Sequence, residues 1–483
     1  MKTRRGAFSA LCFAGVLVVA ACGSSTKTAT PTTLAAGTPA TAAPAATTAP
    51  GGTTAPAATT APAATTAPAG NSILNGEIKC TQQYAGKEVH ILSPVVDSAN
   101  DHPIPQFVDA YKPLADCTGV KIVWEGTKNF EQDVNVRLEG GNAPDVIDFP
   151  QPGLLASSVA KGYLFPLPAD VAAHTSKDFI SGWDVYSTVN GKIYGMPGRS
   201  NVKSLVWYSP KAFTAGGYKV PTTLEEMKAL SDKLVTDKKI PWCVGAASGV
   251  ATGWVLTDWI EDFMLRINGE KVYDQWVKHE IPFNDPKVKA VADAVGAYVK
   301  NPDYLGGDAL VKAIATTKFE EGGLPILTGN CYMHRQASFY STLWPKGTNI
   351  APDGDIWFFY LPSPANGPKY LLGAGDIYAA GTNKPETMDV VRYTGSVDYQ
   401  QQVLDKRHEL SPNKNIDTTK ITDPFLKAVA DLQKNADIFR YDGSDLMPGA
   451  VGTGSFWTEI IAWVIGGSTD DFLNNVEKSW PKS

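Results

Sequence analysis

The sequence predicts an α/β protein of two units, each built on a central, mostly parallel sheet flanked by helices. Short apolar runs typical of strands alternate with segments typical of helices between residues 87 and 160. A second set of such segments starts after Ile193. The chain has 483 residues, and the roughly 400 that have an ordered composition suffice for two domains.

In the first unit, each predicted strand is followed by a predicted helix. The strands are expected at 87–93, 120–124 and 145–149, and the helices at 105–114, 130–138 and 154–160. A helix between two strands returns the chain to the same edge of the sheet, so consecutive strands run parallel.

The second unit repeats this mixture with more helix. Strands are expected at 202–208 and 241–245, helices at 223–235, 254–266, 287–299, 450–465 and 469–476, and further apolar stretches at 324–327, 356–361 and 370–380. We read the 324–327 stretch as a strand, and we expect the chain to cross between the units several times.

Residues 1–21 resemble a secretory signal peptide. Basic residues at positions 2, 4 and 5 precede an apolar run from Ala7 to Ala21, which is too short to span a bilayer comfortably. The run ends in Val-Ala-Ala-Cys at 19–22, similar to a bacterial lipobox, so Cys22 is the expected site of lipidation. The alternative is an ordinary signal peptide with a chance cysteine.

Residues 22–72 are expected to form a disordered tether. They are almost entirely Thr, Ala, Pro and Gly, with a six-residue repeat from Ala55 to Ala67, and they lack apolar groups that could offset the entropy of ordering. Such a segment reaches on the order of 40 Å. Ordered composition begins near Glu77. The expected location is the extracellular face of the cell membrane, with a lipid anchor.

The charge argues against a nucleic-acid partner. The chain has a formal charge of −6, and removal of the three basic residues of the signal peptide leaves 40 Lys and Arg against 49 Asp and Glu, a charge of −9. Phosphate binding requires clustered basic residues, which the sequence does not contain.

Four cysteines remain after export and acylation: Cys80, Cys117, Cys243 and Cys331. Three pairings are possible. The spacing favours disulfides between Cys80 and Cys117 and between Cys243 and Cys331, because each pair flanks elements of one unit. A metal site is the alternative, but no pair has CxxC spacing and no histidine stands at ligand spacing, so we expect no metal.

No catalytic motif or cofactor-binding fingerprint is present. Residues 452–455 lack the context of a nucleophile elbow, and residues 373–375 lack the third glycine of a dinucleotide fingerprint. Asp258, Glu261 and Asp262 share a predicted helix, and a glycosidase needs two acids at the right separation. Charged residues in such a pattern more commonly form the solvent-exposed face of a helix. We therefore expect no enzyme and no cofactor.

Aromatic residues instead recur beside polar groups with planar ends. Trp254 and Trp259 flank Asp258, Arg335 and Gln336 precede two aromatics, and Phe456 and Trp457 open an apolar helix. A sugar needs this mixture, because its C–H faces lie on aromatic rings while its hydroxyls pair with carboxylate, amide and guanidinium groups. The alternative is that these aromatics belong to the core.

The order of several motifs resembles the extracellular solute-binding proteins of carbohydrate ABC transporters, the maltose-binding-protein-like family. The resemblance runs from about 87 to 481. The motifs are Gly-Gly-Asn-Ala-Pro-Asp-Val at 140–146, Tyr-Gly-Met-Pro at 194–197, Val-Trp-Tyr-Ser-Pro-Lys at 206–211, Asp-Leu-Met-Pro at 445–448 and Ser-Phe-Trp at 455–457. Strings at 124–127, 148–153 and 334–339 look like the α-glucoside-binding lipoproteins of actinobacteria.

The resemblance implies a periplasmic-binding-protein type II fold whose two lobes close around a sugar. Lobe 1 would hold about 77–204 and part of 376–440, and lobe 2 about 205–375 and part of 440–483. The substrate-binding residues carried over are Asp148, Phe149, Gln151, Trp254, Asp258, Arg335, Gln336, Asp376, Phe456 and Trp457. For Phe456 the alternative is a core position. The loop 93–101 lacks the aromatic and glycine pattern of the wider family.

The function that the resemblance implies is that of a membrane-tethered receptor for an α-glucoside or related oligosaccharide. Its expected partners are the sugar, the permease subunits of an ABC importer and the membrane, and we expect a monomer. A surface glycoside hydrolase, a binding protein for a non-sugar solute and a structural lipoprotein are the alternatives.

Overall fold

The computed structural model describes residues 72–98, 101–180, 182–407 and 409–482, all of them within one compact unit. The predicted signal peptide, Cys22 and the tether up to Asn71 lie outside the described residues. Ser72, which we assigned to the tether, instead pairs with Lys79 where β1 (Ser72–Ile73) meets β2 (Ile78–Lys79), so ordered structure begins before Glu77. Among the described residues no helix has the length and apolarity needed to cross a bilayer.

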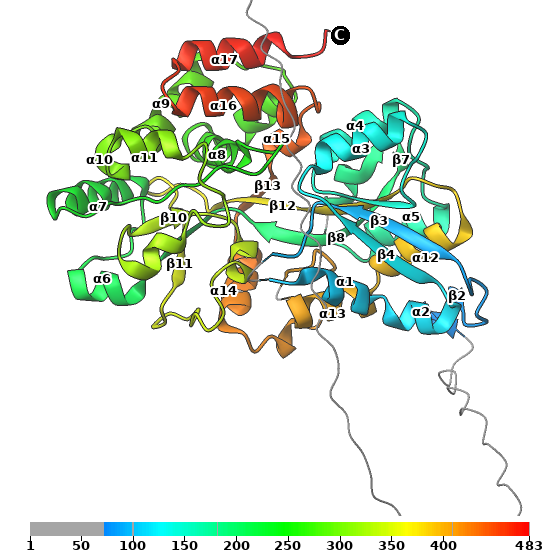
Figure 1. Ribbon diagram of the computed structural model, residues 1–483. Helices are drawn as coiled ribbons and strands as arrows, with labels where there is room; N and C mark the ends of the chain where they lie inside the picture. Colours follow the sequence, from blue (N-terminus) through cyan, green and yellow to red (C-terminus); the bar gives the residue numbers. More distant parts are fainter. Residues whose placement is uncertain (1–71, 99–100, 181, 408, 483) are drawn as a thin grey trace, which may run out of the picture. The chain divides into compact units, whose positions relative to one another are not determined.

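A six-stranded sheet forms the centre of the first half of the fold (Figure 1). Its strands are β3 (Glu88–Ser93), β4 (Lys121–Gly126), β5 (Val146–Phe149), β8 (Gly195–Val202), β12 (Tyr370–Ala380) and β13 (Ile438–Tyr441). β3 pairs in parallel with β4 and β5, and β12 in parallel with β13, whereas β5 and β8 pair with β12 antiparallel. The predicted parallel α/β sheet is therefore confirmed here.

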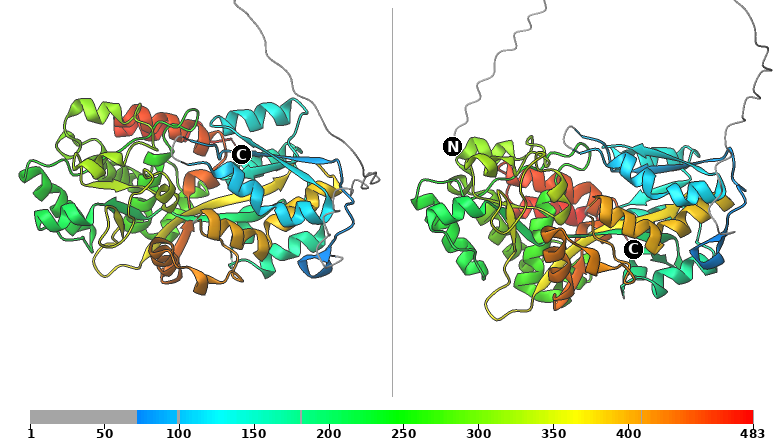
Figure 2. Two further views of the ribbon diagram at one scale, coloured as in Figure 1. Left: turned by 60° about the horizontal axis from the view of Figure 1, so that its bottom comes forward. Right: turned by 90° about the horizontal axis from the view of Figure 1, so that it is seen from below.

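Helices cover both faces of this sheet. Val89 and Ile91 of β3 face a core with α1, α2, α12 and α13, whereas Leu92 faces one with α3 and α4, as the two-residue repeat of a strand dictates. Figure 2 shows α1 beside α13, which it contacts. The bounds are α1 (Pro103–Ala110), α2 (Lys112–Thr118), α3 (Phe130–Glu139), α4 (Pro152–Ala160), α5 (Ala169–Lys177), α12 (Pro385–Thr394) and α13 (Val397–Arg407).

The single helix predicted at 105–114 is two helices in the structure. α1 ends at Ala110, and α2 starts at Lys112 with Pro113 in its first turn. Proline lacks a backbone N–H and its ring crowds the preceding turn, so it is tolerated where a helix begins but not in the interior of one.

The second sheet has three strands and is antiparallel, not mostly parallel as we expected for each unit. Its order is β10 (Met333–Arg335), β9 (Leu205–Tyr208) and β11 (Trp357–Tyr360). The predicted strand at 241–245 makes only one bridge, from Trp242 to Met333, and 324–327 forms a 3-10 turn, Leu324–Thr328. Both segments contain a proline, which cannot donate to a ladder.

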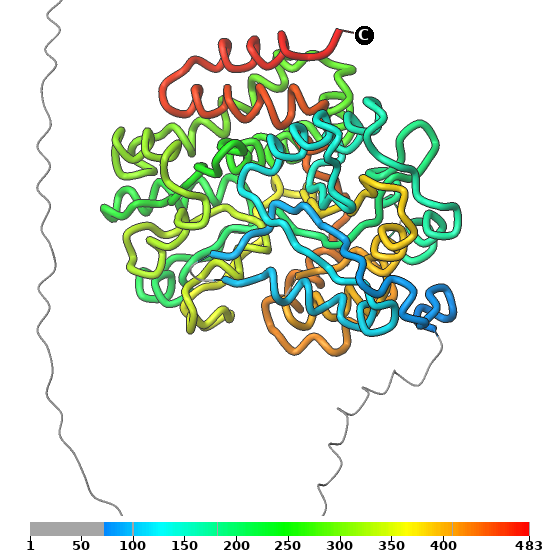
Figure 3. The backbone as a smooth tube through the Cα atoms, turned by 45° about the vertical axis from the view of Figure 1, so that its right-hand side comes forward, coloured from blue at the N-terminus to red at the C-terminus, as the bar shows by residue number. Residues whose placement is uncertain are grey.

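The second sheet is also packed on both faces. Val206 and Tyr208 of β9 face a large helical core, and Leu205 and Trp207 face a core that includes α14. Figure 3 shows the C-terminal helices α16 and α17, orange to red, over the green helices of this half, where α16 contacts α8 and α17 contacts α9. The helices are α6 (Pro210–Gly216), α7 (Leu224–Thr236), α8 (Trp254–Val277), α9 (Pro286–Val299), α10 (Pro302–Leu305), α11 (Asp308–Ala313), α14 (Pro424–Lys434), α15 (Gly443–Leu446), α16 (Trp457–Val464) and α17 (Thr469–Lys478).

Two of these helices differ from their predicted bounds. α8 continues beyond 266 to Val277 through a break at Gly269, whose φ of 77° lies in the left-handed region. The helix predicted at 450–465 begins as a π turn, Val451–Phe456, and becomes α-helical only at Trp457. Glycines at 452 and 454 weaken a regular helix, which is consistent with this irregular first turn.

The chain passes between the two halves several times, as we predicted. β8 leads directly into β9, β12 runs the other way, and the segment after β13 crosses last (Figure 1). At each of these crossings, residues close in sequence belong to different hydrophobic cores. The core beside the six-stranded sheet contains Met196, Tyr378 and Tyr441, and the helical core of the other half contains Val206, Leu372 and Met447.

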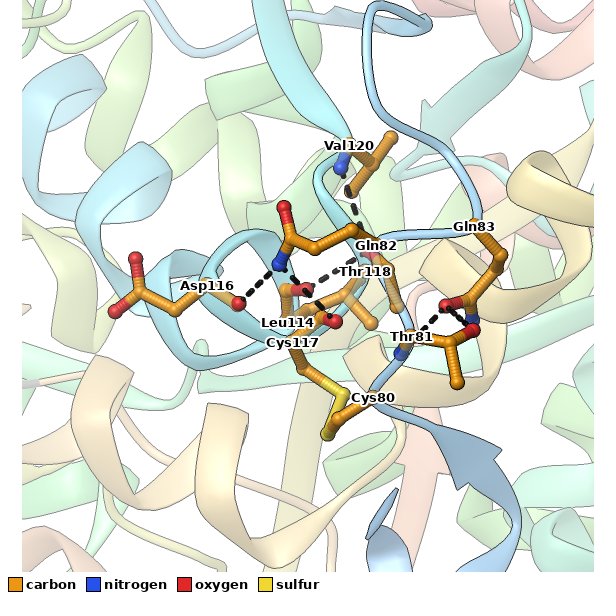
Figure 4. The surroundings of a disulfide bond; sticks show 9 residues. All are labelled: Cys80, Thr81, Gln82, Gln83, Leu114, Asp116, Cys117, Thr118 and Val120. Atoms are coloured by element: carbon orange, nitrogen blue, oxygen red, sulfur yellow. Dashed lines mark hydrogen bonds between the residues drawn. A yellow bond between two sulfur atoms is a disulfide. The ribbon is translucent and has the colours of Figure 1, made fainter. Parts of the chain in front are cut away.

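Both expected disulfides are present, joining Cys80 to Cys117 and Cys243 to Cys331. Figure 4 shows the first, beside which the Gln82 side-chain amide donates to the carbonyl oxygen of Asp116 at 2.7 Å. The bonded cysteines are 37 and 88 residues apart in sequence. In the chain-entropy model, loops of this size stabilise the fold by about 4 and about 5 kcal/mol.

His334 of β10 makes stability depend on pH. Its Nδ1 donates to the carbonyl oxygen of Cys243 at 2.9 Å, and burial lowers the pKa of His334 to about 4. The unfolded chain takes up this proton near pH 6.5, so the contribution of neutral His334 is complete above that pH and is lost as the pH falls toward 4. The loss is about 3 kcal/mol at pH 4.

We expect His334→Asn, whose amide can replace the Nδ1 hydrogen bond, to remove this part of the pH dependence. Urea unfolding of both proteins at pH 7 and pH 4 checks it. A variant that loses as much free energy of unfolding on acidification as the wild type rules out His334 as the source.

Candidate functional site

A cavity of about 450 Å³ lies between the two halves, with residues from both sheets on its wall. Glu131, Gln151 and Asp376 come from the side of the six-stranded sheet, and Trp254 and Phe339 from the side of the three-stranded sheet. Cavities of this volume are in the range that small-molecule sites occupy.

One wall of the cavity is aromatic. Trp254, at the start of α8, meets Phe319 edge to face with ring centroids 5.2 Å apart, and lies 6.0 Å from the Phe339 ring. Trp457, at the start of α16, is 2% exposed and also lines the cavity. Gly253 holds the two tryptophans close, because its φ is 120° and a Cβ there would lie 2.3 Å from the Trp457 carbonyl oxygen.

A buried arginine organises the polar wall on the first side. The Arg199 guanidinium lies 2.6 Å from Asp376, 2.8 Å from Glu409 and 3.4 Å from Asp148. Burial, together with the charge of Asp376, raises the pKa of Asp148 to about 8, although Arg199 opposes the shift. Arg407 extends the network from Glu409 to the cavity wall at Asp101.

A second network lies under the aromatic wall. The Lys203 ammonium pairs with Asp442 and, at 2.9 Å, with Asp258, and it lies 5.4 Å from the centre of the Trp254 ring. Burial would raise the pKa of Asp442, but Lys203 overcomes it and holds that pKa well below its usual range. For Asp258 burial prevails and raises the pKa to about 7.

The acidic trio Asp258, Glu261 and Asp442 has ligand atoms within 4.8 Å of one another, close enough for a metal ion. Its cation is already supplied by Lys203, and Glu261 accepts from the backbone N–H groups of Gly443 and Ser444 at 2.9 and 3.0 Å. The trio is thus a structural ion-pair network.

The structure brings four of the ten predicted substrate-binding residues to the cavity wall. These are Gln151, Trp254, Asp376 and Trp457. They come from distant parts of the chain, as a site between two units requires.

The other six do not line the cavity. Asp148, Asp258 and Arg335 are fully buried in the ion-pair networks, where Arg335 joins Asp258 at 2.9 Å and also contacts Asp262. The structure therefore places these three in the ion-pair networks and not on the cavity wall, and their contact with a ligand stays a prediction.

The structure places Phe149, Gln336 and Phe456 off the cavity wall, and their contact with a ligand stays a prediction. Phe149 packs edge to face on Phe130, Phe456 packs among core rings such as Phe472, and the Gln336 carbonyl accepts from the backbone of Ala337. Neighbours on a strand point to opposite faces, and neighbours on a helix differ by about 100°, so adjacency to a lining residue does not bring a side chain to the cavity. The core alternative holds for Phe456.

Several lining residues were missed from sequence. They are Glu131, Arg199, Lys203, Phe319, Phe339 and Asp445. Arg199 and Lys203 could have been predicted from the sequence. Each lies within or beside an apolar strand, where a charged residue is seldom buried unless it is paired.

The family is shown by comparison with known proteins. The model for bacterial extracellular solute-binding proteins matches residues 100–401. The osmoprotective compounds-binding protein GgtB of Synechocystis sp. is 37% identical over 402 residues, covering 82% of this chain and 93% of that protein. The alpha-glucosides-binding periplasmic protein AglE of Rhizobium meliloti is 38% identical over 387 residues, covering 77% and 83%.

Solved structures share the fold at low sequence identity. A chitin oligosaccharide binding protein matches with a TM-score of 0.69 at 18% identity, covering 81% of this chain and 97% of that one. The maltose-bound MalE3 of T. maritima matches with a TM-score of 0.63 at 16% identity, covering 81% and 98%. The predicted two-lobed α/β class is confirmed, and the chain belongs to the bacterial extracellular solute-binding proteins, a family of binding proteins and not of enzymes.

Proposed function

We propose that this protein is the extracellular substrate-binding component of an ABC importer and captures an α-glucoside in the cavity between its lobes. The observation that carries the proposal is that the indole rings of Trp254 and Trp457 and the planar polar groups of Gln151 and Asp376 line the same cavity, from its two sides. The name of AglE, an alpha-glucosides-binding protein, supports this ligand class.

In the proposed complex, the sugar lies with its C–H faces on the indole rings. Its hydroxyl groups pair with the polar side of the cavity. Two side chains there are incompletely bonded, because Gln151 Oε1 and Trp457 Nε1 have no hydrogen-bond partner among the residues that the structure describes. Buried polar atoms of this kind favour a site that a ligand completes.

Closure would follow the division of lobes that we predicted, with lobe 1 at about 77–204 and part of 376–440, and lobe 2 at about 205–375 and part of 440–483. An ion pair already joins the two halves, since Lys128, just before α3, lies 2.8 Å from Glu320 in the other half, and both residues line the cavity. A ligand that binds the closed form better shifts the population toward it, and the permease would receive that form.

The finer location is also part of the proposal. The family is extracellular, and the sequence adds the lipobox cysteine Cys22 and a Thr/Ala/Pro tether that would hold a monomer at the outer face of the membrane. A lipid chain and a flexible linker of this length keep the receptor near its permease.

A thermal-shift panel tests the ligand class. We expect maltose, trehalose or sucrose to raise the melting temperature, because a ligand at a hundred times its Kd stabilises the folded state by about 2.7 kcal/mol. Cellobiose, which is β-linked, and spermidine serve as controls. A shift with spermidine and none with the sugars would point to a non-sugar solute, and recovery of cleaved sugar would point to a hydrolase.

A further inference from the structure

Each basic side chain on the described cavity wall forms an ion pair with a carboxylate of the protein. Among the residues that the structure describes, the five lining cations and their partners are Lys128 with Glu320, Arg199 with Asp376 and Glu409, Lys203 with Asp258 and Asp442, Lys318 with Glu321, and Arg407 with Asp101 and Glu409. An anionic ligand would therefore have to displace a carboxylate to find a positive charge.

One lining carboxylate, Asp445, has neither a cation nor a hydrogen-bond donor bound to it among the described residues. Asp445 of α15 is 7% exposed, and its backbone N–H is held by the Asp442 carboxylate at 3.2 Å. No described residue donates a hydrogen bond to the Asp445 carboxylate or forms an ion pair with it. Lys203 is near enough to affect it, but the Lys203 ammonium is bonded to Asp258 and Asp442.

A carboxylate that is nine-tenths buried without donors is costly, and native structures nearly always satisfy such groups. The charged groups that face Asp445 come from four elements: Asp442 at the start of α15, Asp258 of α8, Glu131 of α3, and Lys203 between β8 and β9. Three of the four are acidic. The missing partner must therefore be a donor, and the cavity is where one can enter.

We propose that Asp445 contacts the ligand, accepts hydrogen bonds from its hydroxyl groups and restricts the site to neutral, donor-rich glycosides, excluding anionic sugars such as sugar phosphates. This inference rests on the proposed function and deepens it. Glu131 strengthens the exclusion, because it also lines the cavity and, among the described residues, the only side chain that donates to its carboxylate is the Gln151 amide, at 3.0 Å.

The pKa of Asp445 gives the proposal a second observable, the release of protons on ligand binding. Burial, and after it the neighbouring Asp442 carboxylate, raises the pKa of Asp445 well above its usual range. Hydroxyl donors favour the charged form and lower that pKa on binding. Binding thus releases protons, and affinity rises with pH. A residue that only supports the fold would not release protons on ligand binding.

The experiment is calorimetric titration of the full mature protein with maltose, trehalose and sucrose, in buffers of different ionisation enthalpy. The variants are Asp445→Asn, which keeps the shape, Asp445→Glu, which keeps the charge, and Asp353→Asn, an exposed control. The 6-phosphate ester of the sugar that binds is titrated alongside. Thermal melting confirms that each variant is folded.

We expect Asp445→Asn to weaken sugar binding by about tenfold or more and to abolish proton release, while Asp353→Asn changes neither. Asp445→Glu should retain proton release. The phosphate ester should bind the wild type about a hundredfold more weakly than the sugar, and Asp445→Asn should narrow that gap.

Unchanged affinity and unchanged proton release in a folded Asp445→Asn protein would overturn the inference while leaving the proposed function standing. So would a phosphate ester that binds as tightly as its parent sugar. If none of the three sugars binds the wild type, the proposed function fails and the inference falls with it.

Discussion

Replacing Lys203 by methionine is expected to lower the free energy of unfolding by about 3–5 kcal/mol at pH 7. The Lys203 ammonium is the cation bound to Asp442 and one of two bound to Asp258, and all three side chains are buried. Methionine keeps most of the alkyl stem, so the loss comes from leaving Asp442 without a positive partner.

The pH dependence of this difference identifies its cause. Because Lys203 depresses the pKa of Asp442, the stability it provides is present above the unfolded pKa near 3.8 and is lost as the pH falls below it. The difference in free energy of unfolding between the wild type and Lys203→Met should therefore become smaller as the pH falls below about 4. Urea unfolding at pH 7 and pH 3.5 measures it.

Lys211→Met is the matched control. Lys211 pairs with Asp355 at 2.7 Å on the surface, where its side chain is 64% exposed, and exposed pairs contribute about 0–1 kcal/mol. Equal losses in the two variants would show that burial of the Lys203 network adds nothing. A gap that does not change with pH would mean that packing, and not charge, explains the loss.

Replacing Trp457 by alanine is expected to weaken α-glucoside binding by about 1–3 kcal/mol, or about 5- to 150-fold in Kd. Trp457 is 2% exposed and lines the cavity wall beside Trp254. Removing the ring takes away the surface on which the sugar would stack and leaves space that water fills. Titration calorimetry with the sugar that gives a thermal shift measures the change.

Two variants separate binding from folding. Trp457→Phe keeps a smaller ring and should lose less affinity than alanine. Trp480→Ala removes a tryptophan that stacks on His279 at 4.1 Å, away from the cavity wall, and should leave Kd unchanged. If a folded Trp457→Ala protein binds the sugar as tightly as the wild type, Trp457 is not part of the site.

Local sequence patterns predicted most elements of the fold, because apolar periodicity depends on residues close in the chain. The pairing of strands depends on distant residues. The apolar run at 205–208 indicated a strand, but nothing local showed that β10 and β11 would flank it in antiparallel order. Pro241 and Pro325 were the local signs that two other apolar runs would not become strands.

The same limit applies to the candidate site. Trp254 and Trp457 could be predicted, because large aromatics beside polar groups suit a sugar and because the family motifs place them. Asp258 and Arg335 have equally suitable chemistry, yet they neutralise each other in the interior. The sequence showed Asp445 only as part of a family motif. That its carboxylate lacks a hydrogen-bond donor could not be predicted, because its neighbours come from four separate elements of the fold.

The most direct test of the central claim is a crystal structure of the protein with the α-glucoside that binds it. The account predicts one sugar in the cavity between the two halves, with a ring against the Trp457 or Trp254 indole and a hydroxyl within hydrogen-bond distance of the cavity's polar wall. A sugar bound elsewhere on the protein, with the cavity occupied only by water, would contradict it.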